Sequence, residues 1–182
     1  MSSPVPVGEG GKMTVTLTFR LDENVVTILR AESGTRHISL NAMVNQILQN
    51  FVEWNMYEPK VGMMSLFRSV IAEIFKKLTE QEIIEVAVTV GKEAYTDATL
   101  FMKRKFDLDS FLSWLETRMR NSSVEISHNR EGSTHTYVLK HDLGKNFSLF
   151  QKTLLESIFG EVLGIHIDCD CSDKILSFRF ST

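Results

Sequence analysis

One short run near the start of the chain constrains the fold more than any other feature, because it is a lone strand followed at once by two short helices. Apolar and polar residues alternate strictly along this run, with Val15, Leu17, Phe19 and Leu21 on one side and Thr14, Thr16, Thr18 and Arg20 on the other. Period-two alternation with β-branched residues predicts a strand over residues 12–21 that has one apolar face.

Two amphipathic helices are predicted directly after this strand. Asp22 offers an N-cap for the first helix, and Gly34 stands where a C-terminal cap is expected. Ser39 offers an N-cap for the second helix, which we expect to run to about Tyr57. Apolar residues recur at helical spacing in both segments: Val25, Ile28 and Leu29 in the first, and Leu40, Met43, Val44, Ile47, Leu48 and Phe51 in the second.

A strand and two short helices of this kind cannot form a stable fold alone. The strand would have no hydrogen-bonding partner, and three elements are too few to bury their apolar stripes. Two copies solve both problems, because their strands pair antiparallel across a two-fold axis while four helices close over the apolar face. The sequence therefore predicts an obligate homodimer.

Residues 12–56 resemble the ribbon-helix-helix family of DNA-binding proteins, the group that includes MetJ, Arc and the CopG-type regulators. The segment 16–23 is similar to the family's ribbon where it runs into helix one. Gly34 and the segment 38–44 are similar to its turn and to the start of helix two. The resemblance covers about a quarter of the 182 residues, and the rest of the chain resembles no family that we identify.

The resemblance implies a sequence-specific, DNA-binding transcriptional regulator whose partners are double-stranded DNA and a second copy of itself. The two-stranded ribbon would enter the major groove, and the side chains of its polar face would read the bases: Thr16, Thr18 and Arg20. The start of helix two would hold a DNA phosphate through free backbone N–H groups, with a charge-assisted contact from the turn before it: Ser39, Leu40 and Asn41, together with Arg36.

The charge balance gives this interface little electrostatic help. The formal net charge of the chain is −3, whereas affinity for DNA usually depends on a basic surface. Basic and acidic residues also balance within the segment 12–55, namely Lys12, Arg20, Arg30 and Arg36 against Asp22, Glu23, Glu32 and Glu53. We therefore expect modest affinity, with two dimers side by side on the DNA.

The remainder of the chain predicts three helices followed by a ββαββ unit, with residues 58–62 as the linker. Thr79 and Glu82 form a capping box, and small residues around Gly91 predict a close helix crossing. The expected helices lie near residues 63–78, 79–103, 108–119 and 146–163, and the expected strands near 124–128, 134–140, 165–171 and 174–180. The predicted fold class is α+β, with the four strands forming an antiparallel sheet covered on one face.

These elements predict three regions: a flexible tail at residues 1–11, the DNA-binding and dimerisation module at 12–57, and a helical plus ββαββ domain at 62–182. The last region would sense an effector, build higher oligomers, or both. No window approaches 18 consecutive apolar residues and the start of the chain lacks the pattern of a secretory signal, so we expect a cytoplasmic protein without membrane contact.

Cys169 and Cys171 lie in a run with His166, Asp168 and Asp170, all residue types that bind metals. Strand parity places the cysteines on one face and the other three on the opposite face, which argues against one metal cluster. We expect no bound metal, no cofactor and no enzymatic activity, since no catalytic constellation stands out. Two alternatives remain: a dimeric ligand- or metal-binding protein that uses the module only to dimerise, and an antitoxin.

Overall fold

A computed structural model describes residues 15–182 and divides the chain into two compact units. The first unit contributes residues 15–47 to the described structure, and the second comprises Leu48–Thr182. The predicted tail at residues 1–11, and residues 12–14 of the predicted strand, lie outside the described residues. The mixture of helices with a four-stranded antiparallel sheet confirms the α+β class.

The first unit consists of an extended segment, the helix α1 (Glu23–Thr35) and most of α2 (Leu40–Asn50), whose last three residues fall in the second unit. Residues 15–22 form neither a helix nor a strand in this single chain, which differs from the predicted strand. A strand requires a neighbour to which it can hydrogen-bond, and the four strands in the described part of the chain pair only with one another. The ribbon between two copies therefore remains a prediction.

After the end of α2, the second unit contains two short irregular turns, four helices, a hairpin, a further helix and a second hairpin. A π-helical turn (Phe51–Asn55) and a 3₁₀ turn (Glu58–Val61) lead into its regular elements. In chain order these are α3 (Arg68–Lys77), α4 (Glu80–Val86), α5 (Lys92–Lys103), α6 (Leu108–Asn121), β1 (Glu125–Glu131), β2 (Thr134–Lys140), α7 (Lys145–Ser157), β3 (Asp168–Cys171) and β4 (Ile175–Ser181). π-Helical turns join α4 to α5 (Ala87–Gly91) and extend α7 (Ile158–Leu163).

The four strands form one antiparallel sheet in the order β1-β2-β4-β3, so the two predicted hairpins meet at the centre. Tyr137 on β2 lies opposite Phe178 on β4, and both are buried. Thr136 and Ser177, which alternate with them, lie on the other face. One face of the sheet is therefore apolar and the other polar, as expected for an antiparallel sheet with one side in water.

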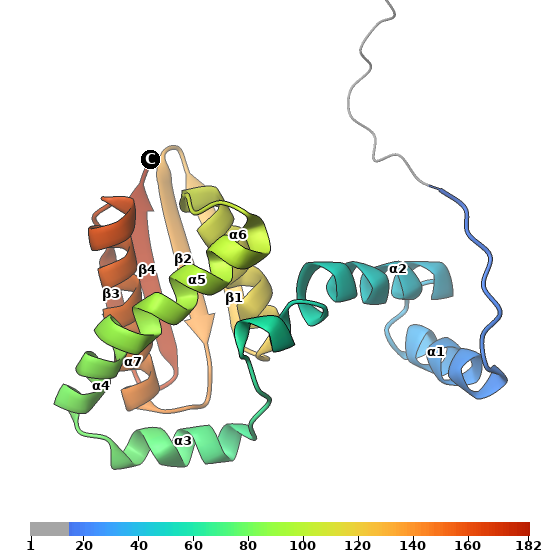
Figure 1. Cartoon of the computed structure of the whole chain (residues 1–182), viewed down its shortest axis with the longest axis horizontal. Coiled ribbons are helices and arrows are strands. Elements are labelled where there is room, and N and C mark those ends of the chain that lie inside the picture. Colours follow the sequence, from blue (N-terminus) through green and yellow to red (C-terminus); the bar gives the residue numbers. More distant parts are fainter. Residues whose placement is uncertain (1–14) are drawn as a thin grey trace, which may run out of the picture. The chain divides into compact units, whose positions relative to one another are not determined.

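Helices cover the apolar face in two layers, as Figure 1 shows for the second unit. The helix α6 contacts β1, and α7 contacts β3 and β4. The continuous helix α4–α5 then packs on α7 and α6. Phe111 on α6 meets Phe159 edge-on at 5.8 Å between ring centroids, and Phe159 lies 5.6 Å from Phe178 on β4, so aromatic rings connect the inner helix layer to the sheet.

The helix crossing predicted at Gly91 is present. A Cβ atom added to Gly91 would lie 3.1 Å from the ring of Phe150 on α7, closer than ordinary van der Waals contact. Glycine therefore lets the two helices approach each other. The capping box at the start of α4 is also confirmed, since the Thr79 hydroxyl accepts a hydrogen bond from the backbone N–H of Glu82 at 3.3 Å.

The predicted helix over residues 63–78 begins later than expected, at Arg68. Residues 63–67 are extended after the left-handed Gly62, and Phe67 is exposed rather than packed in a helical stripe. The start of α3 has no side-chain cap, so no local hydrogen bond favours an earlier helical turn. This extended segment forms one wall of a cleft described below.

Candidate nucleic-acid interface

The predicted base-reading side chains lie on the extended segment before α1. Thr16, Thr18 and Arg20 are all exposed. The apolar residues that alternate with them are exposed as well, and Leu17 and Phe19 keep 68% and 60% of their surface in solvent. In one chain, both faces of this segment are therefore available for contacts.

The helix α1 begins where the sequence predicts, because the Asp22 carboxylate accepts a hydrogen bond from the backbone N–H of Asn24 at 2.8 Å. Two of its apolar residues, Val25 and Ile28, stay exposed in the single chain. The apolar surface of the extended segment is thus continued by an uncovered part of α1.

The turn between the helices differs from the prediction that placed a left-handed cap at Gly34. Gly34 lies inside α1, and His37 takes the left-handed conformation with φ of 53°. The N–H of Ile38 donates to the Ser33 carbonyl at 3.0 Å, and the N–H of His37 donates to the Gly34 carbonyl at 3.1 Å. These two bonds form a Schellman motif, which closes the helix without a glycine at the left-handed position.

The start of α2 has the arrangement that the prediction requires. The Ser39 hydroxyl accepts a hydrogen bond from the Ala42 N–H at 3.1 Å, and the Ser39 carbonyl accepts one from the Met43 N–H at 3.0 Å. The N–H groups of Leu40 and Asn41 precede the first hydrogen bonds within the helix, so they remain available to an anion. This confirms the predicted N-cap.

Arg36 stands just before this helix start but is already engaged. Its Nε lies 2.6 Å from the Glu32 carboxylate, one helical turn back on α1. A phosphate bound at the start of α2 would have to compete with Glu32 for this guanidinium. The structure gathers Arg36, Ser39, Leu40 and Asn41 around one turn, while Thr16, Thr18 and Arg20 form a separate group on the extended segment.

No protein-family model matches this chain, and no curated protein is significantly similar to it. The functional assignment therefore rests on the residues and their geometry.

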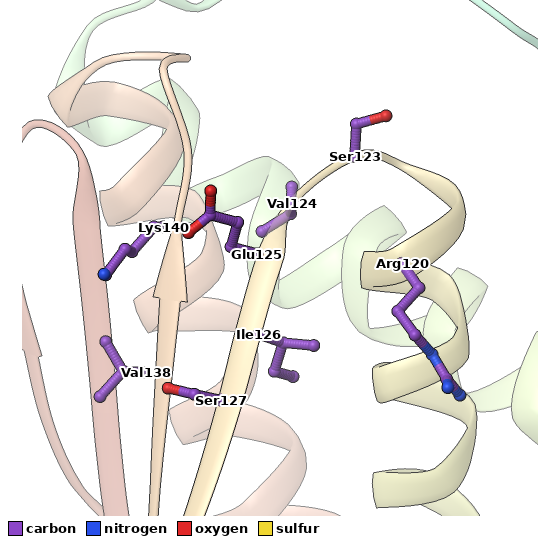
Figure 2. Close-up of a pocket in the computed structure, with 8 residues that line it drawn as sticks. All are labelled: Arg120, Ser123, Val124, Glu125, Ile126, Ser127, Val138 and Lys140. Atoms are coloured by element: carbon purple, nitrogen blue, oxygen red, sulfur yellow. The ribbon is translucent and has the colours of Figure 1, made fainter. Parts of the chain in front are cut away.

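The second unit also has surface features that could compete as a functional site. An open hollow lies beside the edge strand β1, where Ile126 points toward the α6 side that carries Arg120, while Ser127 and Val138 lie on the other face of the sheet (Figure 2). The residues that line the hollow therefore lie on both sides of the edge strand, and their side chains do not point toward a common ligand position.

Strand parity separates the cysteines of β3 from its aspartates. Cys169 and Cys171 pair with the buried Phe178 and Leu176 of β4, whereas Asp170 pairs with Ser177 on the other face. Cys169 is buried, Cys171 is exposed, and His166 lies 3.5 Å from Asp168. Burial raises the pKa of the Cys169 thiol to about 12, so this residue packs as a small apolar side chain. Within residues 15–182, no group of three or more histidine, cysteine or acidic side chains converges as a metal site would require.

His141 and Ser148 are in contact but form part of the fold. The His141 Nδ1 accepts the Leu143 N–H at 3.2 Å, so its Nε2 carries the proton and faces the Ser148 hydroxyl at 2.9 Å. That hydroxyl in turn donates to the Ser172 carbonyl. These bonds fix the loop between β2 and α7 against the turn between β3 and β4.

No helix in the described part of the chain is long and apolar enough to span a membrane.

Proposed function

We propose that this chain is a sequence-specific DNA-binding transcriptional regulator that acts as a homodimer through its first unit. The observation that carries the proposal is the alternation of apolar and polar residues over residues 15–21, all of which are exposed on one extended segment. Paired as a strand, this segment would present an apolar and a polar face. An intermolecular ribbon uses both faces, since the apolar one packs on helices and the polar one meets DNA.

The uncovered apolar surface supports the dimer. Leu17, Phe19, Val25 and Ile28 are all exposed in one chain, although they lie on neighbouring elements. Burial of apolar surface contributes roughly 25 cal/mol per Å². A second copy supplies matching helices and an identical strand, so one two-fold arrangement covers the apolar residues and pairs the strand edges.

The DNA contacts follow from the geometry of the major groove, which admits a two-stranded ribbon. Arg20 is suited to donate two hydrogen bonds to guanine, and Thr16 and Thr18 are suited to contact base edges or thymine methyl groups. The Leu40 and Asn41 N–H groups at the start of α2 would fix the register by holding a backbone phosphate.

A second candidate function is supported by the charges. Arg36 is paired with Glu32, and basic and acidic residues balance over the segment 12–55, so this segment lacks the basic surplus of most DNA-binding proteins. In that case the first unit only dimerises, and the protein acts through a ligand held by the second unit.

Two variants with the same new residue separate these functions. Leu17→Asp places a charge in the shared apolar core and should abolish the dimer. Thr18→Asp places the same charge on the polar face, so it should keep the dimer and lose DNA binding. The measurements are sedimentation analysis and the enrichment of a two-fold symmetric site from a random pool of DNA duplexes. If the wild type and Thr18→Asp are both dimers and neither enriches a DNA site, the result would favour a first unit that only dimerises.

A further inference from the structure

A cleft of about 460 Å³ lies within the second unit, where segments far apart in the sequence converge. One side is formed by Trp54 and Glu58 in the turns after α2, and another by the extended segment 63–66. The last turn of α6, with Arg118 and Asn121, and the loop before α7 complete it. Its volume lies in the range of small-molecule sites, roughly 300–1,000 Å³.

The lining carries one unpaired charge of each sign. Arg118 has no carboxylate partner in the described structure, and its guanidinium carbon lies 4.6 Å above the ring of Tyr95, which holds it in place. Glu58 likewise forms no ion pair within residues 15–182. The second arginine of the lining, Arg68, is neutralised by Asp142. Arg118 and Glu58 therefore remain available to a ligand, and they do not satisfy each other.

Further polar groups support a ligand with two charged ends. The Asn121 side-chain amide donates to the Thr117 carbonyl at 2.9 Å, which leaves its oxygen free to accept a hydrogen bond. This oxygen and the carboxylate of Glu58 are both acceptors, as an ammonium group requires. Arg118 offers the fork of donors that matches a carboxylate.

Part of the remaining wall is apolar, and Ser65, Ser122 and Ser123 add polar groups to it. Trp54 and Phe147 are buried, Leu143 is buried beside them, and Ile71 is half-buried on α3. The extended segment adds Met64, an adaptable side chain that keeps 76% of its surface exposed at the mouth. This apolar part of the wall suits an aliphatic or aromatic side chain of a ligand.

We propose that this cleft binds a free α-amino acid with an apolar side chain. The ligand's carboxylate pairs with Arg118, its ammonium group with Glu58 and Asn121, and its side chain packs on Trp54 and Phe147. The inference does not depend on DNA binding by the first unit, because all of these residues belong to the second unit.

Calorimetric titration of the full chain with L-phenylalanine, L-leucine and L-methionine tests the proposal. Two further probes keep the phenyl ring and carbon chain of phenylalanine but each lack one charged group. 3-Phenylpropionate lacks the ammonium group, and phenethylamine lacks the carboxylate. Saturable binding of at least one amino acid is expected. Loss of one charged contact should weaken binding roughly ten- to a hundredfold, so both analogues should bind correspondingly more weakly.

Charge-neutral variants identify the site. Glu58→Gln and Arg118→Gln should each weaken binding to a similar degree, whereas Glu93→Gln and Arg130→Gln, which change exposed charges outside the cleft, should not. Because Arg118 also stacks on Tyr95, its variant is compared with wild type by thermal unfolding, and Glu58→Gln carries the test if Arg118→Gln does not fold. Absence of saturable binding up to millimolar concentrations, or equal binding by either analogue, would overturn the proposal.

Discussion

Arg36 and Glu32 form an ion pair across one turn of α1, with 2.6 Å between the guanidinium Nε and the carboxylate oxygen. Both side chains are about half exposed, so the pair contributes little to stability, on the order of 0–1 kcal/mol. Its position bears on the proposed function, because a phosphate held at the start of α2 would have to compete with Glu32 for Arg36, which lies just before that helix.

Glu32→Gln should therefore strengthen DNA binding. The change frees Arg36 and removes a negative charge near the phosphate, and a gain of up to about 1 kcal/mol corresponds to roughly a fivefold lower Kd. Fluorescence-anisotropy titrations of wild type and variant at low and high salt measure the effect. Glu93→Gln makes the same charge change in the second unit and serves as the control; an equal gain in both variants would argue against a phosphate contact at Arg36.

Arg20→Ala should weaken specific binding by roughly 1–3 kcal/mol if Arg20 reads a base, and it should leave the dimer intact. Arg30→Ala removes an exposed arginine from α1 and should affect all DNA sequences to a small and similar extent. The comparison requires the preferred site and an unrelated duplex of the same length. Unchanged discrimination between the two duplexes in Arg20→Ala would remove Arg20 from the reading face.

His37→Gly should stabilise the first unit, since His37 holds the left-handed conformation that the Schellman motif requires. Glycine adopts the left-handed conformation without the steric cost of a Cβ atom, so the free energy of unfolding should rise by about 1 kcal/mol. Urea unfolding followed by circular dichroism measures the change. Gln46→Gly introduces the same residue in the middle of α2 and should destabilise by a similar amount. A loss of stability in His37→Gly would contradict the assignment.

The second unit should lose stability in mild acid through His141. Burial, the largest cause, lowers the pKa of His141 below its ordinary value of 6.5, and Arg68 acts in the same direction while Asp142 opposes it. Just below pH 6.5, His141 therefore binds a proton in the unfolded chain but stays neutral in the folded chain. The associated stability is present above pH 6.5 and is lost as the pH falls through the lower folded pKa.

Urea unfolding of wild type and His141→Asn between about pH 8 and pH 5 tests this dependence. Asparagine keeps an acceptor for the Leu143 N–H but does not titrate, so the variant should lose part of the acid sensitivity. Burial also lowers the pKa of His135, which should supply part of the remaining slope. An acid sensitivity in His141→Asn equal to that of the wild type would contradict this role of His141.

Local signals in the sequence predicted much of the second unit. Thr79 and Glu82 marked the start of α4 through a capping box, and the period-two runs around Tyr137 and Phe178 marked the central strands. Each of these signals is a hydrogen bond or a burial pattern formed by neighbours in the chain, which is why the sequence alone reveals it.

Features that depend on distant neighbours were not predictable in the same way. Trp54 continues the spacing of the apolar stripe of the second helix, but that spacing does not reveal its partner: the Trp54 ring is buried in the core of the second unit, with its centroid 6.5 Å from that of Trp114. The cleft between Glu58 and Arg118 exists only because separate segments converge. His37, rather than Gly34, occupies the left-handed position at the end of α1, because the helix continues past the glycine to Thr35. The residue types alone did not indicate where the helix would end.

The most direct test of the central claim is a fluorescence-anisotropy titration of labelled, mixed genomic DNA fragments with the full chain at several salt concentrations. A regulator that uses Arg20 and the start of α2 should bind, and the logarithm of its affinity should fall linearly with the logarithm of the salt concentration as counterions are released from the phosphates. Absence of binding at the lowest salt concentration, by a chain that sediments as a dimer, would contradict the claim and leave the first unit as a dimerisation module.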